Sequence, residues 1–285
     1  MKRVLITTKG HLAPGTATMG SEDTVPSLRL AMADYFTLGN ALCGFMAVWQ
    51  LAAAAHYAAA ASVPLQRDAI ATAVILLLAA AAFDLFDGRV ARRFGGSGMG
   101  AELDNLADVI SFGFAPAFFV VAWGTLGGNG GLAPVAAAAA VLLAVVVRLA
   151  RFSCQSPGAT SFSGLPGPFG AMAVVTIVLL DPPVLVGTVA VLAVAWLMVS
   201  RIEYPKPRGR LAYAVLAWML GSVACLAAWA VDAPAGETLL YSGSSLVLLL
   251  MLAIPFYVVM TRRGGSDDDT ADALPTPMPP TPREG

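Results

Sequence analysis

Charged residues are scarce in this chain. They make up 12% of its 285 residues, whereas hydrophobic residues make up 58%. Soluble globular domains contain about 25% charged and about 45–50% apolar residues. The composition therefore excludes a soluble globular domain and a disordered chain. The formal net charge of -1 also provides no overall basic field that would attract a nucleic acid, so no nucleic-acid partner is expected.

Cysteine and histidine are also rare. The three cysteines, Cys43, Cys154 and Cys225, are widely separated, which argues against a disulfide framework or a zinc site. The two histidines, His11 and His56, lie away from the acidic segment described below. Metal ligands in that segment would therefore have to be oxygen atoms.

Long apolar runs indicate a polytopic membrane protein. A transmembrane helix needs about 20 predominantly apolar residues, and an unclosed chain in lipid must be helical because lipid cannot pair backbone groups. Polar breaks separate eight candidate spans, at residues 36–57, 70–86, 106–126, 132–147, 164–180, 183–199, 211–231 and 239–260. We predict an all-α bundle of about eight transmembrane helices, of which the fifth and sixth are the least regular.

The distribution of basic residues predicts the orientation of the bundle. With eight spans and a cytoplasmic N-terminus, the inner segments contain 16 of the 17 Lys and Arg residues, and only Arg67 lies outside. We therefore expect an integral protein of the cell membrane with both termini in the cytoplasm.

The chain divides into four predicted regions. Residues 1–35 form a cytoplasmic tail with a candidate interfacial helix, and residues 36–205 form the membrane core. Residues 206–263 add two transmembrane helices. Residues 264–285 contain an acidic run and many Pro and Thr residues, and we expect them to be disordered.

Four aspartates mark the junction between the second and third spans. Asp84 and Asp87 are three residues apart, and Asp104 and Asp108 are four apart, so each pair shares one helix face. The Gly-rich link between them is short, which makes the two helices antiparallel neighbours at the cytoplasmic side. We expect the four carboxylates to converge on one small volume.

This convergence indicates a divalent cation site. A charged Asp near the middle of the membrane costs about 2.5–3.5 kcal/mol, and close carboxylates repel unless cations lie among them. Oxygen ligands suit Mg²⁺ or Mn²⁺, and two such ions are the usual arrangement for displacement at phosphorus. Charges snorkelling at a helix end would not explain four acids at these spacings. The Gly-rich link lacks the Gly-Lys-Ser/Thr ending of a phosphate loop, so a plain turn is expected there.

The acidic stretch resembles the signature of the CDP-alcohol phosphotransferase family, D-x2-D-G-x2-A-R, a spacer and G-x3-D-x3-D. The matching residues are Asp84, Asp87, Gly88, Ala91, Arg92, Gly100, Asp104 and Asp108. The spacer between Arg92 and Gly100 is one residue shorter than is usual for the family. The flanks resemble the phosphatidylserine synthase branch, at residues 37–45, 111–116, 148–152, 164–166 and 200–205.

The resemblance implies an activity and roles for particular residues. The implied reaction joins CDP-diacylglycerol and L-serine to give phosphatidylserine and CMP, in a protein that forms a homodimer. Two Mg²⁺ or Mn²⁺ ions would be held by Asp84, Asp87, Asp104 and Asp108, and Asp108 would also act as the general base. Small residues at Gly88, Ala91 and Gly100 would let the CDP group approach closely, and Arg92 would neutralise phosphate charge.

Four further residues are candidates with an open alternative. Thr37 and Asn40 either reach the cytidine or hydrogen-bond between helices. Arg148 and Arg151 either bind the serine carboxylate or lipid phosphate, or anchor a helix end on the cytoplasmic side.

Alternatives remain for the function as well. The acceptor could be glycerol phosphate or inositol phosphate, and the donor could carry an archaeal-type lipid. An ion or proton transporter would also use intramembrane acids, although no internal repeat is visible and the acids lie in one hairpin.

Overall fold

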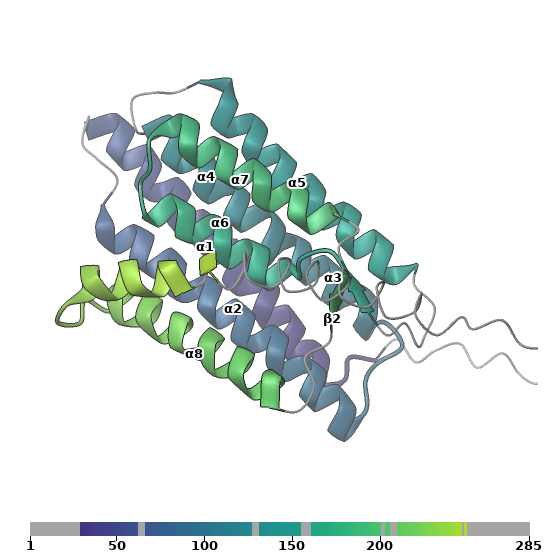
Figure 1. The fold of residues 1–285 in the computed structure, drawn as a ribbon. Coiled ribbons are helices and arrows are strands. Elements are labelled where there is room, and N and C mark those ends of the chain that lie inside the picture. Colours follow the sequence, from purple (N-terminus) through teal and green to yellow (C-terminus); the bar gives the residue numbers. More distant parts are fainter. Residues whose placement is uncertain are drawn as a thin grey trace, which may run out of the picture.

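The protein is a bundle of antiparallel helices (Figure 1). The computed structural model describes residues 29–61, 66–126, 131–154, 161–200, 203–205, 210–246 and 248–249. The predicted C-terminal tail and most of the predicted N-terminal tail lie outside these residues. The helices are α1 Met32–Ala61, α2 Arg67–Phe94, α3 Gly100–Asp108, the π-helix η1 Val109–Phe114, α4 Ala115–Leu126, α5 Leu132–Ser153, α6 Gly167–Leu179, α7 Val184–Val199 and α8 Arg210–Ala230.

Four helical segments are long and apolar enough to cross a membrane: Met32–Ala61, Arg67–Phe94, Gly100–Thr125 and Leu132–Ser153. Three shorter apolar helical segments follow, at Gly167–Leu179, Val184–Val199 and Leu220–Ala230. The described part of the last predicted span is also helical at residues 236–246. The chain is therefore a helical membrane protein, while the count of eight spans and the position of the termini stay predictions.

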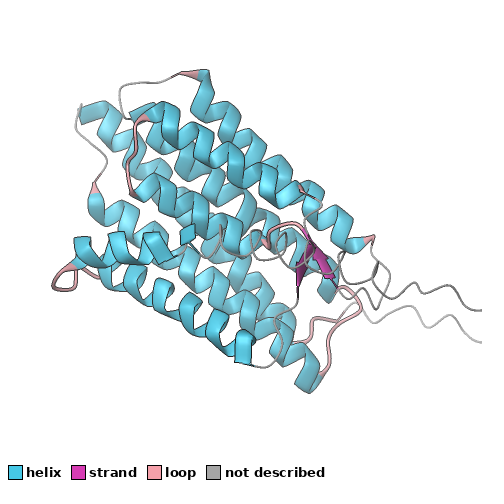
Figure 2. Ribbon diagram, viewed as in Figure 1, coloured by secondary structure: helices cyan, strands magenta, loops and turns pink. Residues whose placement is uncertain are grey.

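A short two-stranded ribbon is the part of the fold that the all-α prediction did not include (Figure 2). Strand β1 Ser161–Ser163 pairs antiparallel with β2 Glu203–Pro205, with Phe162 opposite Tyr204. These strands precede α6 and follow α7, so the ribbon joins the two loops at that end of the α6–α7 pair. Composition could not predict it, because three residues are too few for a period-2 pattern.

Two apolar clusters hold the bundle together. One is built from α4, α5, α6 and α7 around Val141 and Val174, and the other from α1, α2, α4 and α8 around Leu51 and Phe119. Many of the buried residues are alanines, which let helices approach closely in lipid. Large apolar side chains such as Trp196, 65% exposed, cover the outer surface. This surface suits lipid rather than water.

The third predicted span contains a π-helix directly after Asp108. Residues Val109–Phe114 form η1, which includes the Ser111-Phe112-Gly113 motif. Such insertions occur frequently at functional sites. Helix α1 packs closely against this segment at Gly44, where an added Cβ would lie 2.7 Å from the Ser111 Cα. Only glycine permits this approach, which brings α1 against the acidic end of the α2–α3 hairpin.

Candidate active site

Three of the four predicted aspartates form one cluster. One carboxylate oxygen from each of Asp84, Asp104 and Asp108 lies within 4.8 Å of the others. Asp84 comes from the last turns of α2, and the other two lie one turn apart on α3. The hairpin therefore brings Asp84 together with Asp104 and Asp108, whereas the prediction had all four carboxylates converging on one small volume. Asp108 is buried, at 9% exposed, and the other two are half-buried.

Asp87 faces a different neighbour. It is buried, at 7% exposed, and its Oδ2 accepts a hydrogen bond of 2.8 Å from Thr37 Oγ1 on α1. Thr37 Oγ1 also lies 3.4 Å from the Ala33 carbonyl oxygen, one turn earlier in α1. Asp87 thus joins α2 to α1 and borders the cavity described below rather than the three-carboxylate cluster.

The cluster suits a divalent cation. Hard cations bind oxygen at about 2.0–2.6 Å, so two ligand oxygens of one ion are separated by roughly 4–5 Å at most. The separation within the cluster meets this limit. In addition, Asp104 Oδ1 is buried and has no hydrogen-bond partner among the residues that the structure describes. Buried carboxylate oxygens need a partner of this kind, and an oxygen-only ligand set favours Mg²⁺ or Mn²⁺ over zinc.

Asn40 connects Asp108 to α1 and η1. The Asn40 side chain is fully buried, and its Nδ2 donates to Asp108 Oδ1 at 3.4 Å. Ser111 Oγ, from η1, donates to the Asn40 carbonyl oxygen at 2.8 Å. Thr37 and Asn40 therefore form hydrogen bonds between helices, which was the alternative to contacts with the cytidine. Asn40 contacts Oδ1 of Asp108, and Oδ2 takes no part in this hydrogen bond.

The two candidate arginines have different surroundings. Arg148 is half-buried and interacts electrostatically with Asp108 and Asp84. Its Nε is buried and finds no hydrogen-bond partner in the described part of the chain. Arg151 is exposed, and its Nη1 donates to the Val199 carbonyl oxygen at 2.6 Å, at the end of α7. Arg148 therefore interacts electrostatically with the carboxylates, whereas Arg151 ties α5 to α7.

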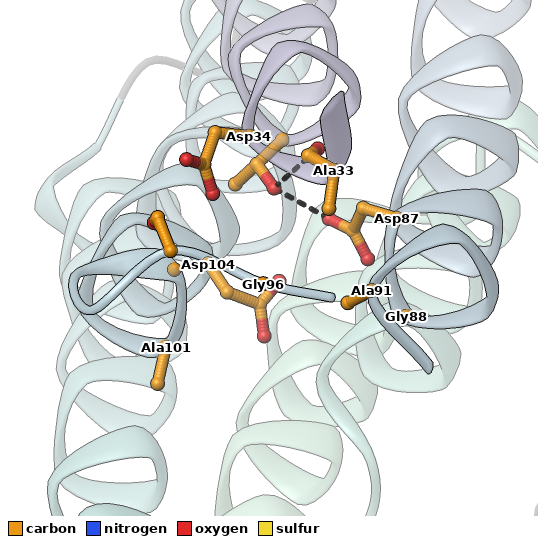
Figure 3. A pocket seen from close by; sticks show the side chains of 11 residues that line it. Ala33, Asp34, Asp87, Gly88, Ala91, Gly96, Ala101 and Asp104 are labelled. Atoms are coloured by element: carbon orange, nitrogen blue, oxygen red, sulfur yellow. Dashed lines mark hydrogen bonds between the residues drawn. The ribbon is translucent and has the colours of Figure 1, made fainter. Parts of the chain in front are cut away.

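A cavity of about 220 Å³ adjoins the cluster (Figure 3). It is lined by Ala33, Asp34, Thr37, Asp87, Gly88, Ala91, Gly96, Ser97, Gly100, Ala101 and Asp104. The predicted small residues Gly88, Ala91 and Gly100 are among them, as is Asp104 from the carboxylate cluster. Arg92 is exposed and does not line the cavity. Its Nη1 nevertheless lies 3.3 Å from the position that a Cβ added to Gly88 would take.

The sequence interpretation did not include Asp34 or Ser97 at this cavity. Asp34 is an acidic residue that is only 1% exposed, and Ser97 Oγ is buried with no hydrogen-bond partner within the described ranges. An acidic residue at the start of an apolar run was the available signal for Asp34, because buried intramembrane charges are usually functional. Nothing in the sequence distinguished Ser97 from the other residues of the Gly-rich link.

Comparisons with known proteins agree with this geometry. The family model described as CDP-alcohol phosphatidyltransferase matches residues 30–263. The chain is 31% identical over 172 residues to CDP-diacylglycerol–serine O-phosphatidyltransferase of Bacillus subtilis (strain 168), covering 59% of this chain and 86% of that protein. The protein of the same name from Methanocaldococcus jannaschii is 30% identical over 180 residues, covering 62% of this chain and 75% of the relative.

A third relative carries a different name. Archaetidylserine synthase of Methanothermobacter thermautotrophicus is 36% identical over 141 residues, covering 48% of this chain and 59% of that protein. The family match extends over most of the chain and includes both the carboxylate cluster and the cavity. The chain belongs to the CDP-alcohol phosphatidyltransferase family and is a membrane-embedded transferase of phospholipid biosynthesis.

Proposed function

We propose that this protein transfers the phosphatidyl group of CDP-diacylglycerol to the hydroxyl of L-serine, giving phosphatidylserine and CMP. The observation that carries the proposal is the cluster of Asp84, Asp104 and Asp108 beside a cavity lined by small residues. Relatives named as serine O-phosphatidyltransferases match most of their own length to this chain, which supports serine as the acceptor.

The four aspartates would hold two divalent ions, Mg²⁺ or Mn²⁺. Asp84, Asp104 and Asp108 form the cluster, and Asp87 lies one turn beyond Asp84 on the same helix. When bound, such ions polarise phosphoryl oxygens and stabilise negative charge on a departing phosphate. Gly88, Ala91 and Gly100 would let the CDP group approach the backbone of α2 and α3, with Arg92 near its phosphates.

Asp108 is the proposed general base. Its Oδ1 accepts from Asn40, which orients the carboxylate and leaves Oδ2 for the substrate hydroxyl. Asp108 accepts the serine hydroxyl proton while the serine oxygen attacks the phosphorus that carries diacylglycerol. A new oxygen–phosphorus bond forms to serine, the bond from this phosphorus to the bridging oxygen breaks, and CMP leaves.

Arg148 is the proposed anion-binding residue of the acceptor side. It interacts electrostatically with Asp108, and its buried Nε has no hydrogen-bond partner among the described residues, so it can bind the serine carboxylate or the lipid phosphate. A glycerol phosphate or inositol phosphate acceptor would add a second phosphate charge. Arg148 acts electrostatically on both Asp84 and Asp108. A guanidinium at this position would suit an acceptor with a single carboxylate.

The proposal includes a cellular setting. The charge distribution of the sequence supports a cell-membrane protein whose active site faces the cytoplasm, where CDP-diacylglycerol presents its headgroup and serine is dissolved. The homodimer is proposed on the family resemblance alone. The donor lipid is diacylglycerol or an archaeal-type lipid, since an archaetidylserine synthase is also among the relatives. Membership in a transferase family argues against the transporter alternative.

The test is CMP release by the purified protein in detergent. We expect release with CDP-diacylglycerol, Mn²⁺ or Mg²⁺ and serine, and none after chelation with EDTA. Asp108→Asn should abolish release while the unfolding temperature stays unchanged. Asp68→Asn, on the exposed first turn of α2, is the matched control and should remain active. Release only with glycerol phosphate or inositol phosphate would overturn the acceptor, and full activity of Asp108→Asn would remove it from the mechanism.

A further inference from the structure

A second hollow lies on the outer surface of the bundle, between the neighbouring helices α5 and α7 (Figure 1). It measures about 320 Å³, and eight apolar residues of the two helices line it, among them Leu143, Ala144, Ala195 and Trp196. These eight residues are different from those that line the cavity beside the carboxylates. Arg151 at the end of α5 contacts Val199 at the end of α7, so the two helices run in the same direction.

The hollow is a groove with a floor of small residues and walls of large ones. The floor residues Ala144 and Ala195 are 4% and 5% exposed, whereas the wall residues Leu143 and Trp196 are 62% and 65% exposed. The lining covers two turns of each helix, which makes the groove about 11 Å long at about 5.4 Å a turn. One leaflet of a bilayer core is roughly 15 Å thick. The groove can therefore follow a lipid chain through most of one leaflet.

A basic group closes one end of the groove. Arg151 lies one turn beyond the lining residue Val147 on the same face of α5, and its Nη1 donates to the carbonyl oxygen of Val199, which also lines the groove. The Arg151 side chain is exposed. The ion pair among the described residues joins Arg67 to Asp232, so no carboxylate there pairs with Arg151. A guanidinium has five N–H donors, and the remaining ones can bind a phosphate.

We infer that the groove binds one acyl chain of an anionic phospholipid whose phosphate contacts Arg151. The chain lies on the alanine floor between the walls of α5 and α7, where it gains van der Waals contacts that a smooth helix surface does not offer. The phosphate lies at the membrane interface, where basic residues attract anionic headgroups. The groove thus selects a chain, and the arginine selects the charge of the headgroup.

This lipid is distinct from the donor of the proposed reaction. Arg148 lies three residues before Arg151, is half-buried and interacts electrostatically with Asp84 and Asp108. Arg151 is exposed and shares its helix face with the groove residues instead. A phosphate on Arg151 is therefore held on the outer side of α5, while the carboxylates face the inner side. The bound lipid is a membrane component that the protein retains and does not consume.

A second copy of the chain is the other candidate to cover an apolar outer groove. A helix is about 10–12 Å wide, so it would reach the floor between Leu143 and Trp196 only through single side chains. One hydrocarbon chain can instead lie along the whole length of the groove. An apolar helix face would also bring no anion to Arg151. These features favour a lipid over a second copy.

The fluorescence of Trp196 provides the test, because this residue forms one wall of the groove. The full-length protein in detergent is titrated with phosphatidylglycerol or with phosphatidylcholine, each with brominated acyl chains that quench a tryptophan on contact. The part of the quenching that Trp196→Phe loses belongs to Trp196. We expect phosphatidylglycerol to quench Trp196 at a concentration about 5-fold lower than phosphatidylcholine does, the effect of one arginine on an anionic headgroup.

Trp49 is the matched control. It is 54% exposed on α1 and is not among the residues of the groove. Its share of the quenching, measured as the loss in Trp49→Phe, should be the same for both lipids, as for ordinary contact with a membrane. Arg151→Gln should abolish the preference for phosphatidylglycerol at Trp196 and leave Trp49 unaffected.

A second pair of variants tests the floor of the groove. Ala140 lines the end of the groove opposite Arg151, so Ala140→Leu should fill that end and weaken the quenching of Trp196 by both lipids. Ala139→Leu adds the same side chain at an exposed position outside the groove and should leave the quenching unchanged. If Arg151→Gln does not fold, equal quenching in these two alanine variants would itself overturn the inference.

The remaining outcomes decide between the occupants. Equal quenching of Trp196 by the two lipids in the wild-type protein would make the groove an ordinary lipid-facing surface and refute the inference. Quenching by neither lipid, together with a particle mass of two copies, would assign the groove to a second copy and refute it as well. The titrations contain no CDP-diacylglycerol, serine or metal ion. A failure of the proposed function would therefore leave their result intact, and a failure here would leave the proposed function intact.

Discussion

The contact between Gly44 and η1 allows a sharp test of how α1 positions the active site. In Gly44→Ala the new Cβ would lie 2.7 Å from the Ser111 Cα, whereas ordinary contacts begin near 3.4 Å. The closest backbone atom belongs to a helix, so no side-chain rotation relieves the clash. Either α1 or η1 must move by roughly 1 Å, and overpacking of this kind costs about 1–3 kcal/mol.

The same displacement should affect catalysis. Asn40 lies one turn before Gly44 on α1, and its contacts with Asp108 and Ser111 join α1 to the carboxylate cluster. Misplacement of a catalytic group by about 1 Å can lower a rate by roughly 100-fold. We therefore expect Gly44→Ala to lower the rate of CMP release by on the order of 10- to 100-fold. The unfolding temperature should fall by roughly 2–12 °C, at about 2–4 °C for each kcal/mol.

Gly221→Ala is the matched control. Gly221 lies within α8, and no heavy atom of the described residues lies within 4 Å of the position of its added Cβ. The substitution should be neutral or stabilise the helix by about 0.5–1 kcal/mol. Because the clash at Gly44 involves the Ser111 Cα, the double variant Gly44→Ala/Ser111→Ala should not recover activity. If Gly44→Ala were as stable and active as Gly221→Ala, the argument that this contact positions Asp108 would be wrong.

Two further predictions concern the arginines. Arg148→Lys should raise the KM for serine if Arg148 binds the serine carboxylate, or lower kcat if it binds the lipid phosphate. Arg151→Lys should leave both constants close to wild type and lower the unfolding temperature slightly. Equal kinetic defects in the two variants would contradict the separation of their roles. At the other end of α2, Arg67 donates to the Trp229 carbonyl oxygen at 2.8 Å, pairs with Asp232 at 3.1 Å and lies 5.0 Å from the Trp229 ring centroid. Arg67→Ala should lower the free energy of unfolding by about 1–2 kcal/mol and leave CMP release unchanged. A loss of activity without a loss of stability would refute this structural role.

Much of the site was predictable because its spacing is local. Asp84 and Asp87 are three residues apart, and Asp104 and Asp108 are four apart, so any helix places each pair on one face. The short link forces the two helices into a hairpin, and the cluster of Asp84, Asp104 and Asp108 follows. The apolar stretches were predictable for a similar reason, since their hydropathy alone decides that they enter lipid.

Other features depend on contacts between distant segments. Thr37 and Asp87 are 50 residues apart, and Asn40 and Asp108 are 68 apart, so no local pattern shows that they meet. The π-helix after Asp108 was equally hidden, because its sequence is as apolar as the α-helix that follows it. The same two alternatives were open for both arginines, yet packing against α7 gives Arg151 a backbone partner, while Arg148 interacts electrostatically with the carboxylates.

The sequence by itself determined that this chain enters a membrane as helices and that its two acidic pairs belong to one hairpin, because hydropathy and helical period act over a few turns. Only the tertiary structure decided which oxygens share the cluster, which residues orient Asp108, and which polar groups border the cavity. Those outcomes depend on how α1 packs against α2, α3 and η1, and close packing is set by the shapes of side chains that come from far apart in the chain.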